Sequence, residues 1–299
     1  MVGRPDMQIR KRTFSDWVLD SFVYGFMIVL GLITLLPMIH VFSKSVSSDW
    51  ALVSGRVNLL PVGFQLDTLL KVATSYAFGR AFAISVIVTV VGTLLSIVVT
   101  AITAYPLSKR HLPGISGIMV LFVFTMLFNG GLIPNYLLIR DLHLLNNLWS
   151  LILPAMISVF NMLVIKSYYE GLPEALEESA RMDGAKTYVI LFRIILPLSM
   201  PVLAAIALFY AVGFWNDYFS PMLYISDPLL KTLQLHLRDI VMENDTANAL
   251  NKSADDLMNM SPESIRAATV VASTVPILLV YPFLQKYFIK GVLIGSVKG

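Results

Sequence analysis

Six apolar stretches divide this chain, and each is close to the length that a helix needs to cross a lipid bilayer. A membrane-spanning helix takes about 20 mostly apolar residues. The strict two-residue alternation of an outer-membrane barrel is not seen in any of the stretches. The sequence therefore predicts an all-α fold, a polytopic membrane protein with six transmembrane helices. The stretches are Trp17–Phe42, Phe78–Tyr105, Ile115–Asn129, Leu148–Tyr168, Leu198–Tyr224 and Ala267–Phe288.

The low content of charged residues supports this interpretation. Of the 299 residues, 57% are hydrophobic and 14% are charged, whereas a soluble domain carries about 25% charged residues. The net charge of +3 is too small to indicate a nucleic-acid partner. The chain has no cysteine, which excludes disulfides and thiolate chemistry. No pair of histidines has the spacing of metal ligands, so we expect no metal site.

Lys and Arg residues near the ends of the stretches predict the orientation of the chain. With the N-terminus inside, 13 of the 22 Lys and Arg residues lie on the inner side and 9 lie on the outer side, where the loops are longer. We therefore expect a cytoplasmic N-terminal segment (1–16), a transmembrane domain (17–289) and a cytoplasmic C-terminal tail (290–299). Long outer loops are expected at 43–77 and 225–266.

Local signals predict two helical features in the second outer loop. A short helix is expected near Leu233–Met242. Ser261-Pro262-Glu263 combines a capping residue, a proline suited to the first helical position and an acidic residue in the first turn. This sequence marks the start of the last helix.

A polar loop at 170–197 lies on the predicted cytoplasmic side, between the fourth and fifth stretches. Pro173 suits the first turn of a helix, and acidic residues in that turn are favoured by the helix dipole. Gly184 stands where a left-handed residue would end the helix, and a second helical stretch runs from Thr187 to Ile195. The loop is therefore predicted to be a short helix, a glycine turn and a second helix. The acidic residues are Glu174, Glu177 and Glu178.

This loop resembles the EAA loop of ABC-transporter permeases. The resemblance rests on Glu178-Ser179-Ala180, Gly184, Ile194 and Leu196-Pro197, with Ser179 where the pattern usually has alanine. The run from Pro173 to Ala185 looks like the form used by maltose-type carbohydrate permeases, and so do three further segments. The likeness covers nearly the whole chain and is closest to the six-span subunit of oligosaccharide importers of the lipoprotein-linked type. The further segments are Gly213-Phe214-Trp215-Asn216-Asp217-Tyr218, Tyr281–Phe288 and Gly295–Gly299.

The resemblance implies the function and the partners of the chain. It would be one permease of a heterodimer in the cell membrane, working with two ATP-binding subunits and an extracytoplasmic sugar-binding protein. ATP and Mg would be held by the partner ATPase, so this chain would have no catalytic residue and no cofactor of its own. The positions carried over for coupling to the ATPase are Glu178, Ser179, Ala180, Asp183 and Gly184.

Two polar groups within the apolar stretches are candidates for the substrate path, because polar groups inside a membrane are costly unless they have a function or a partner. Trp215, Asn216 and Asp217 offer a ring for stacking on a sugar and polar groups for its hydroxyls. Phe160 and Asn161 match a stretch that lines the cavity in maltose-type permeases. Trp215 and its neighbours could instead form an interfacial belt, and Asn161 could form a hydrogen bond between helices.

Three other functions remain open at this stage. An ABC permease for an amino acid or a peptide would share the EAA loop. A secondary transporter would need an ion-coupling site near the membrane midplane, yet the middles of the stretches hold no acidic residue. An intramembrane enzyme would need a catalytic motif such as HExxH or GxSxG, and the sequence has neither.

Overall fold

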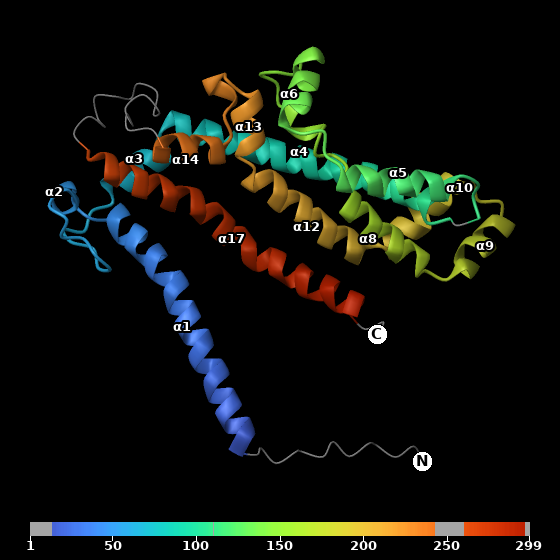
Figure 1. Cartoon of the computed structure of the whole chain (residues 1–299), viewed down its shortest axis with the longest axis horizontal. Helices are drawn as coiled ribbons and strands as arrows, with labels where there is room; N and C mark the ends of the chain where they lie inside the picture. The colour runs from blue at the N-terminus through green and yellow to red at the C-terminus, as the bar shows by residue number, and fades with distance from the viewer. Residues whose placement is uncertain (1–13, 110, 243–259, 297–299) are drawn as a thin grey trace.

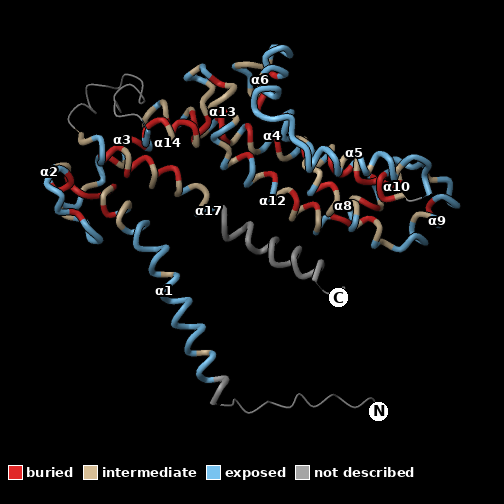
Figure 2. The backbone as a smooth tube through the Cα atoms, in the orientation of Figure 1, coloured by how far each residue is buried: buried red, intermediate tan, exposed pale blue. Residues whose placement is uncertain are grey.

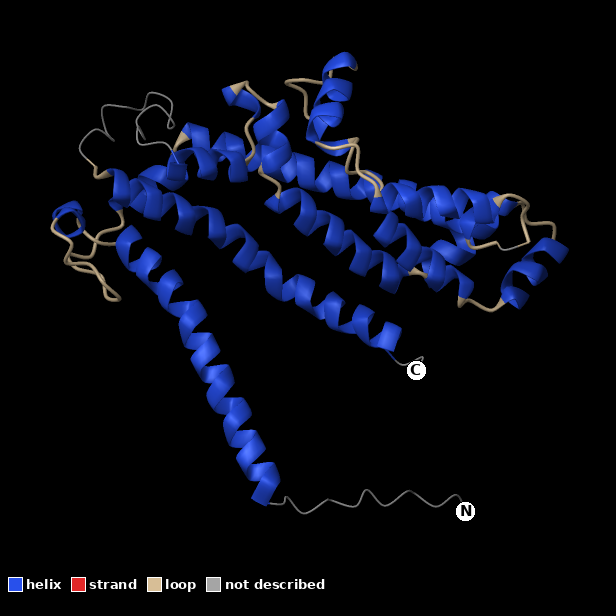
Figure 3. Ribbon diagram, in the orientation of Figure 1, coloured by secondary structure: helices blue, strands red, loops and turns tan. Residues whose placement is uncertain are grey.

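The computed structural model describes residues 14–109, 111–242 and 260–296, and this described part consists of helices and loops without a strand (Figure 3). The predicted all-α class is therefore confirmed. The longer helices are α1 (Phe14–Ser45), α4 (Tyr76–Leu107), α5 (Ile115–Leu127), α8 (Val159–Glu170), α12 (Met200–Asn216) and α17 (Pro262–Ser296). The shorter helices are α2 (Asp49–Val53), α3 (Asp67–Thr74), α6 (Leu132–Asp141), α7 (Trp149–Ile152), α9 (Glu174–Met182), α10 (Thr187–Ile190), α11 (Leu196–Leu198), α13 (Phe219–Tyr224) and α14 (Leu233–Met242).

The body of the protein is a bundle in which α12 packs against α4, α8 and α17. Figure 1 shows α9 and α10 at one end of this bundle and α2, α3 and α14 at the opposite end. The first helix, α1, meets the bundle near α2 and then diverges from it (Figure 1). Most described residues of α1 are exposed, as its largely pale blue trace in Figure 2 shows, and Ser43 and Ser45 near its end are buried.

The contact between α4 and α12 is built from small and polar residues on α4. A Cβ atom added at Gly92 would lie 2.8 Å from the ring of Phe214, so a larger residue at this position would force that ring to move. Eight residues after Gly92 on α4, the Thr100 hydroxyl lies 2.8 Å from the hydroxyl of Tyr210 on α12. Small residues and hydroxyl contacts of this kind hold helices together in membranes, where lipid removes the hydrophobic driving force.

The helices agree with the predicted spans only in part. Within the described residues, α1 and α4 are long and apolar enough to cross a membrane unbroken. Two further pairs of helices pass the same test together but are bent, by 111° between α5 and α6 and by 80° between Thr187–Leu198 and α12. The last stretch lies within α17. The number of six spans therefore stays a prediction.

Two stretches that we expected to be continuous helices are broken. In Leu148–Tyr168, α7 ends at Ile152 and α8 begins only at Val159. Pro154 explains the break, because proline has no N–H for the helix and clashes with the preceding turn. In Leu198–Tyr224, α12 ends at Asn216, and Asp217 has an extended backbone with ψ 117°.

Local signals predicted other boundaries correctly. The helix expected near Leu233–Met242 is present as α14 with these bounds. The last helix begins at Pro262, and the backbone N–H of Ser264 donates to the Ser261 hydroxyl at 3.1 Å. Of the predicted terminal segments, residues 1–13 and 297–299 lie outside the described part of the chain.

Candidate functional site

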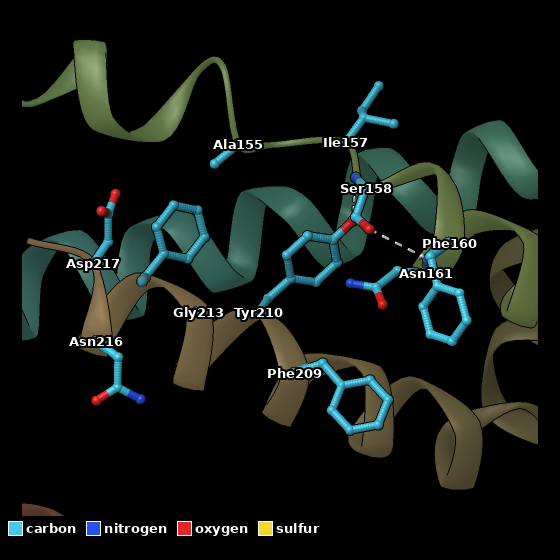
Figure 4. Close-up of a pocket in the computed structure, with 11 residues that line it drawn as sticks. Ala155, Ile157, Ser158, Phe160, Asn161, Phe209, Tyr210, Gly213, Asn216 and Asp217 are labelled. Carbon is cyan, nitrogen blue, oxygen red and sulfur yellow. Dashed lines mark hydrogen bonds between the residues drawn. The ribbon is translucent and has the colours of Figure 1, made fainter. Parts of the chain in front are cut away.

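A cavity of about 820 Å³ lies between α8 and α12. Figure 4 shows side chains from these two helices, and from the segment that precedes α8, gathered around it. Four of the five residues predicted for the substrate path line this cavity, although they come from stretches more than 50 positions apart. The lining residues are Ala155, Ile157, Ser158, Phe160, Asn161, Phe209, Tyr210, Gly213, Phe214, Asn216 and Asp217.

The break in the fourth stretch forms one wall of the cavity. Ser158 caps α8, since its hydroxyl accepts a hydrogen bond from the backbone N–H of Asn161 at 3.4 Å. The Ser158 backbone N–H in turn donates to the hydroxyl of Tyr210 at 2.9 Å. Figure 4 shows Tyr210 beside Ser158. Because the same hydroxyl contacts Thr100 at 2.8 Å, Tyr210 joins α4, α8 and α12 at the cavity wall.

The polar side chains of the cavity differ in how many hydrogen bonds they already make within the chain. The Asn161 side chain is 6% exposed, and only its backbone takes part in a hydrogen bond that the described residues provide. The Asp217 carboxylate accepts from the backbone N–H groups of Phe219 and Ser220 at 3.0 and 3.1 Å through a single oxygen, Oδ1. Asn161 and the second carboxylate oxygen of Asp217 are therefore available to a ligand.

Trp215 does not line the cavity. Its ring contacts Phe82 edge to face, with 6.0 Å between centroids, and packs against the buried cluster that includes Val72, Phe78 and Leu233. The helical period explains this position. With 3.6 residues per turn, Trp215 points about 180° away from the face that carries Tyr210, Gly213 and Asp217.

Sequence reasoning missed the aromatic side of the cavity. Phe209, Tyr210 and Phe214 line it, and all three precede the cluster that we singled out. The signal was present in the sequence, because positions 210, 213, 214 and 217 recur at intervals of three and four residues and so share one face of a helix.

The polar loop forms the predicted helix, glycine turn and second helix. Gly184 has φ +79°, the left-handed conformation that favours glycine. The backbone N–H of Ala185 donates to the carbonyl of Ala180 at 2.9 Å, and that of Gly184 to the carbonyl of Arg181 at 3.0 Å. These two bonds are the Schellman motif that ends many helices.

The five positions predicted for coupling are not equally accessible. Glu178, Ser179, Asp183 and Gly184 are exposed, whereas Ala180 is 9% exposed and belongs to the core of this chain. Ala180 therefore attaches α9 to its own chain. After the turn, α10 continues into a π-helical turn (Leu191–Ile195) and α11, before the 80° bend into α12.

Glu177, which precedes the predicted coupling residues, lies in a buried ionic contact. Its carboxylate pairs with the Lys109 ammonium and accepts from the Tyr105 hydroxyl at 3.3 Å. Arg181, one turn along α9, is 4.0 Å from the same carboxylate. Lys109, Glu177 and Arg181 line a cleft of about 650 Å³ between the end of α4 and α9. Among the described residues, no three His, Asp or Glu side chains are grouped so that they could hold a metal ion.

These features define a class, namely a helical membrane protein with an open, lined cavity between two of its helices and a hairpin that projects from one end. A family model described as "Binding-protein-dependent transport system inner membrane component" matches residues 110–294. The chain belongs to this family. It is the membrane permease subunit of an ABC importer, and it does not itself carry out catalysis.

The chain is similar to several known proteins over nearly its whole length. It is 41% identical over 283 residues to the polygalacturonan/rhamnogalacturonan transport system permease protein YtcP of Bacillus subtilis (strain 168), covering 94% of this chain and 98% of that protein. Protein LplC of the same organism is 43% identical over 272 residues, covering 90% and 91%.

A solved structure shows the same fold. One chain in the crystal structure of a bacterial ABC transporter involved in the import of the acidic polysaccharide alginate matches with a TM-score of 0.85 and 33% sequence identity. The match covers 92% of this chain and 98% of that chain. The fold described here is therefore that of an ABC importer permease.

Proposed function

We propose that this permease subunit imports an oligosaccharide and forms half of the translocation path. The observation that carries this proposal is the cavity between α8 and α12, where aromatic rings lie beside amide and carboxylate groups. Named relatives support the class of substrate. YtcP is named for polygalacturonan and rhamnogalacturonan, and AraQ of Halalkalibacterium halodurans, 28% identical over 301 residues, is named for arabinooligosaccharides.

The chemistry of the cavity suits a sugar ring. Sites for small ligands are about 300–1,000 Å³ in volume and combine an apolar lining with a few polar groups. Here Phe209, Tyr210 and Phe214 supply the apolar surfaces, and Asn161 and Asp217 supply hydrogen-bonding groups. Aromatic faces fit the apolar face of a sugar, while amide and carboxylate groups bind its hydroxyls.

The charge of the lining bears on which sugar is bound. The eleven lining residues include one carboxylate, that of Asp217, and neither Lys nor Arg. An acidic sugar carries carboxylates, which need a cation or several donors once they leave water. If the substrate is acidic, the second permease subunit must supply these groups, so we propose that this half of the path binds hydroxyls.

The surface of α1 supports a partner within the membrane. Large apolar side chains are exposed along its described length, including Phe22 at 71%, Tyr24 at 68% and Ile33 at 65%. Such a surface is stable only against lipid or another membrane protein. We propose that both are present, with a second permease subunit completing a heterodimer.

The two ends of the bundle differ, and we propose that each end meets a different partner. We propose that the α9 hairpin faces the cytoplasm together with both termini, and that Glu178, Ser179, Asp183 and Gly184 meet one of two ATP-binding subunits. Those subunits would hold ATP and Mg. The opposite end, with α2, α3 and α14 (Figure 1), would face an extracytoplasmic sugar-binding protein.

Purification of the tagged chain from its native host tests this function. We expect a second permease and an ATP-binding subunit to co-purify, and we expect oligosaccharides, presented with the binding protein, to stimulate ATP hydrolysis. Stimulation by amino acids or peptides, with none by saccharides, would contradict the proposed substrate class.

A further inference from the structure

The coupling helix α9 is attached to the rest of the chain by few side chains. Of its nine residues, Ala180 is buried, Glu177 is half-buried and the other seven are exposed. Residues three apart lie on the same face of a helix, so Ala180 and Glu177 form a single narrow line of contact. Ala180 and Glu177 are therefore the side chains of α9 that are most buried against the bundle.

Of the two, only Glu177 makes a directional contact. Ala180 packs through a methyl group, which leaves α9 able to rock about it. The Glu177 carboxylate pairs with Lys109 just beyond the end of α4 and accepts from the Tyr105 hydroxyl in its last turn. The Glu177 and Lys109 side chains are 12% and 17% exposed, and exclusion of water strengthens an ionic contact.

The Lys109 side chain is itself held in place by α4. Its ammonium group lies 5.0 Å from the centre of the Tyr105 ring, and that ring contacts Tyr169 of α8 edge to face at 6.2 Å. The partners of Glu177 are therefore themselves packed against two helices of the bundle, α4 and α8.

The helix that receives this contact also supports the cavity. Five residues before Tyr105, Thr100 of α4 contacts the hydroxyl of Tyr210, which accepts from Ser158 at the cavity wall. Two covalent routes also leave α9, one through residues 171–173 to α8 and one through the π-helical turn and the 80° bend to α12. Neither route runs through α4, so the contact with Lys109 and Tyr105 adds a third connection.

We propose that the Glu177–Lys109 ion pair is a positioning contact that makes α4 move with α9. When the ATP-binding subunit displaces α9, this pair prevents the helix from rocking about Ala180 and carries the displacement to α4. The neighbouring Glu178 is exposed and stays available to the partner. Of these two adjacent glutamates, Glu177 would bind within its own chain and Glu178 would contact the ATP-binding subunit. This inference rests on the proposed function.

Sugar import per ATP hydrolysed, measured on the purified complex in proteoliposomes with its binding protein, tests the proposal. For Glu177→Gln and for Lys109→Met we expect ATP hydrolysis to continue while import per ATP falls about tenfold, a typical size for coupling between two sites. Because the residues act as a pair, the double variant should be no worse than either single variant.

A matched control is available within the chain. Lys166 pairs with Glu170 inside α8 at 2.8 Å, and these side chains are 16% and 18% exposed, much like the proposed pair. Lys166→Met removes a similarly buried ion pair whose two partners both belong to α8, and it leaves Glu177 and Lys109 in place, so import per ATP should stay at the level of the unaltered protein.

Four outcomes would overturn the proposal. They are unchanged import per ATP in Glu177→Gln, losses that multiply in the double variant, an equal loss in Lys166→Met, and loss of the ATP-binding subunit from the purified complex, which would assign Glu177 to docking. Failure of the proposed function is distinguishable, because the unaltered complex would then show no ATP-dependent import of sugar.

Discussion

The hydroxyl of Tyr210 on α12 lies 2.8 Å from the hydroxyl of Thr100 on α4 and also accepts a hydrogen bond from the backbone of Ser158. Three segments that are far apart in the sequence thus meet at one atom. Tyr210 is 5% exposed and lines the cavity, so the same atom that links the helices fixes the shape of the candidate substrate site.

Tyr210→Phe should weaken this junction without removing the ring. The variant leaves the Ser158 N–H and the Thr100 hydroxyl without their partner, which costs about 1–3 kcal/mol for a buried group. We expect a lower unfolding temperature in detergent and a higher half-saturating sugar concentration. Tyr188→Phe is the control, because that side chain is 60% exposed. Equal unfolding temperatures for the two variants would show that the junction contributes nothing.

Substitutions at Gly184 separate backbone strain from docking. Its φ of +79° disfavours any side chain with a Cβ, yet apart from its two chain neighbours no described residue has an atom within 4 Å of a Cβ built there. Gly184→Asn should fold with little loss, since asparagine tolerates this conformation. Gly184→Asp should insert into the membrane but abolish transport, because it adds a charge where the ATP-binding subunit docks. Normal uptake by Gly184→Asp would count against that docking role.

Substitutions in the cavity test its contact with sugar. Asn161→Leu removes the available amide, and we expect the half-saturating sugar concentration to rise about tenfold, which corresponds to 1.4 kcal/mol. Asp217→Leu should change sugar preference, but it also removes the cap of α13. Asp217→Asn is the matched variant, because it keeps an oxygen for that cap and removes the charge. Unchanged uptake kinetics for several sugars in all three variants would exclude these positions from the path.

His236 on α14 predicts a dependence of stability on pH. The side chain is buried, which with the nearby Lys231 lowers its pKa to about 4, against a smaller opposite effect of Asp239. Between pH 6.5 and 4 the unfolded chain therefore binds the proton that the folded chain excludes, so stability falls as the pH falls, by about 2 kcal/mol at pH 5. The measurement is the unfolding temperature at pH 7 and pH 5.

Removal of the imidazole isolates this effect from the titration of carboxylates. His236→Gln should lose less stability between pH 7 and pH 5 than the unaltered protein does, whereas His143→Gln, at an exposed position, should lose the same amount. A steeper loss in His236→Gln than in the unaltered protein would contradict the lowered pKa.

Features set by neighbouring residues could be predicted from the sequence. The helix Leu233–Met242, the start of α17 after Ser261 and the turn at Gly184 all rest on capping, periodicity or backbone conformation within a few residues. The break at Pro154 had a local signal too, but the apolar run around it outweighed this signal in our interpretation. The helical phase of Trp215 could likewise have been worked out beforehand.

Features set by distant residues could not be predicted. Lys109 and Glu177 are 68 positions apart, and Thr100 and Tyr210 are 110 apart. Before the fold is known, Lys109 is one of many basic residues near a span end, and Thr100 is one of several hydroxyls on an apolar helix. Only the packing of α4 against α8, α12 and the hairpin selects these partners.

The most direct test of the whole account is the side of the membrane on which α9 lies. The chain has no cysteine, so a single cysteine placed at the exposed Ala175 reports its own position without interference. We predict that a membrane-impermeant maleimide labels Ala175→Cys in inverted vesicles and leaves it unlabelled in intact cells. Labelling in intact cells, with none in inverted vesicles, would place the hairpin outside the cell, away from ATP, and would contradict the account.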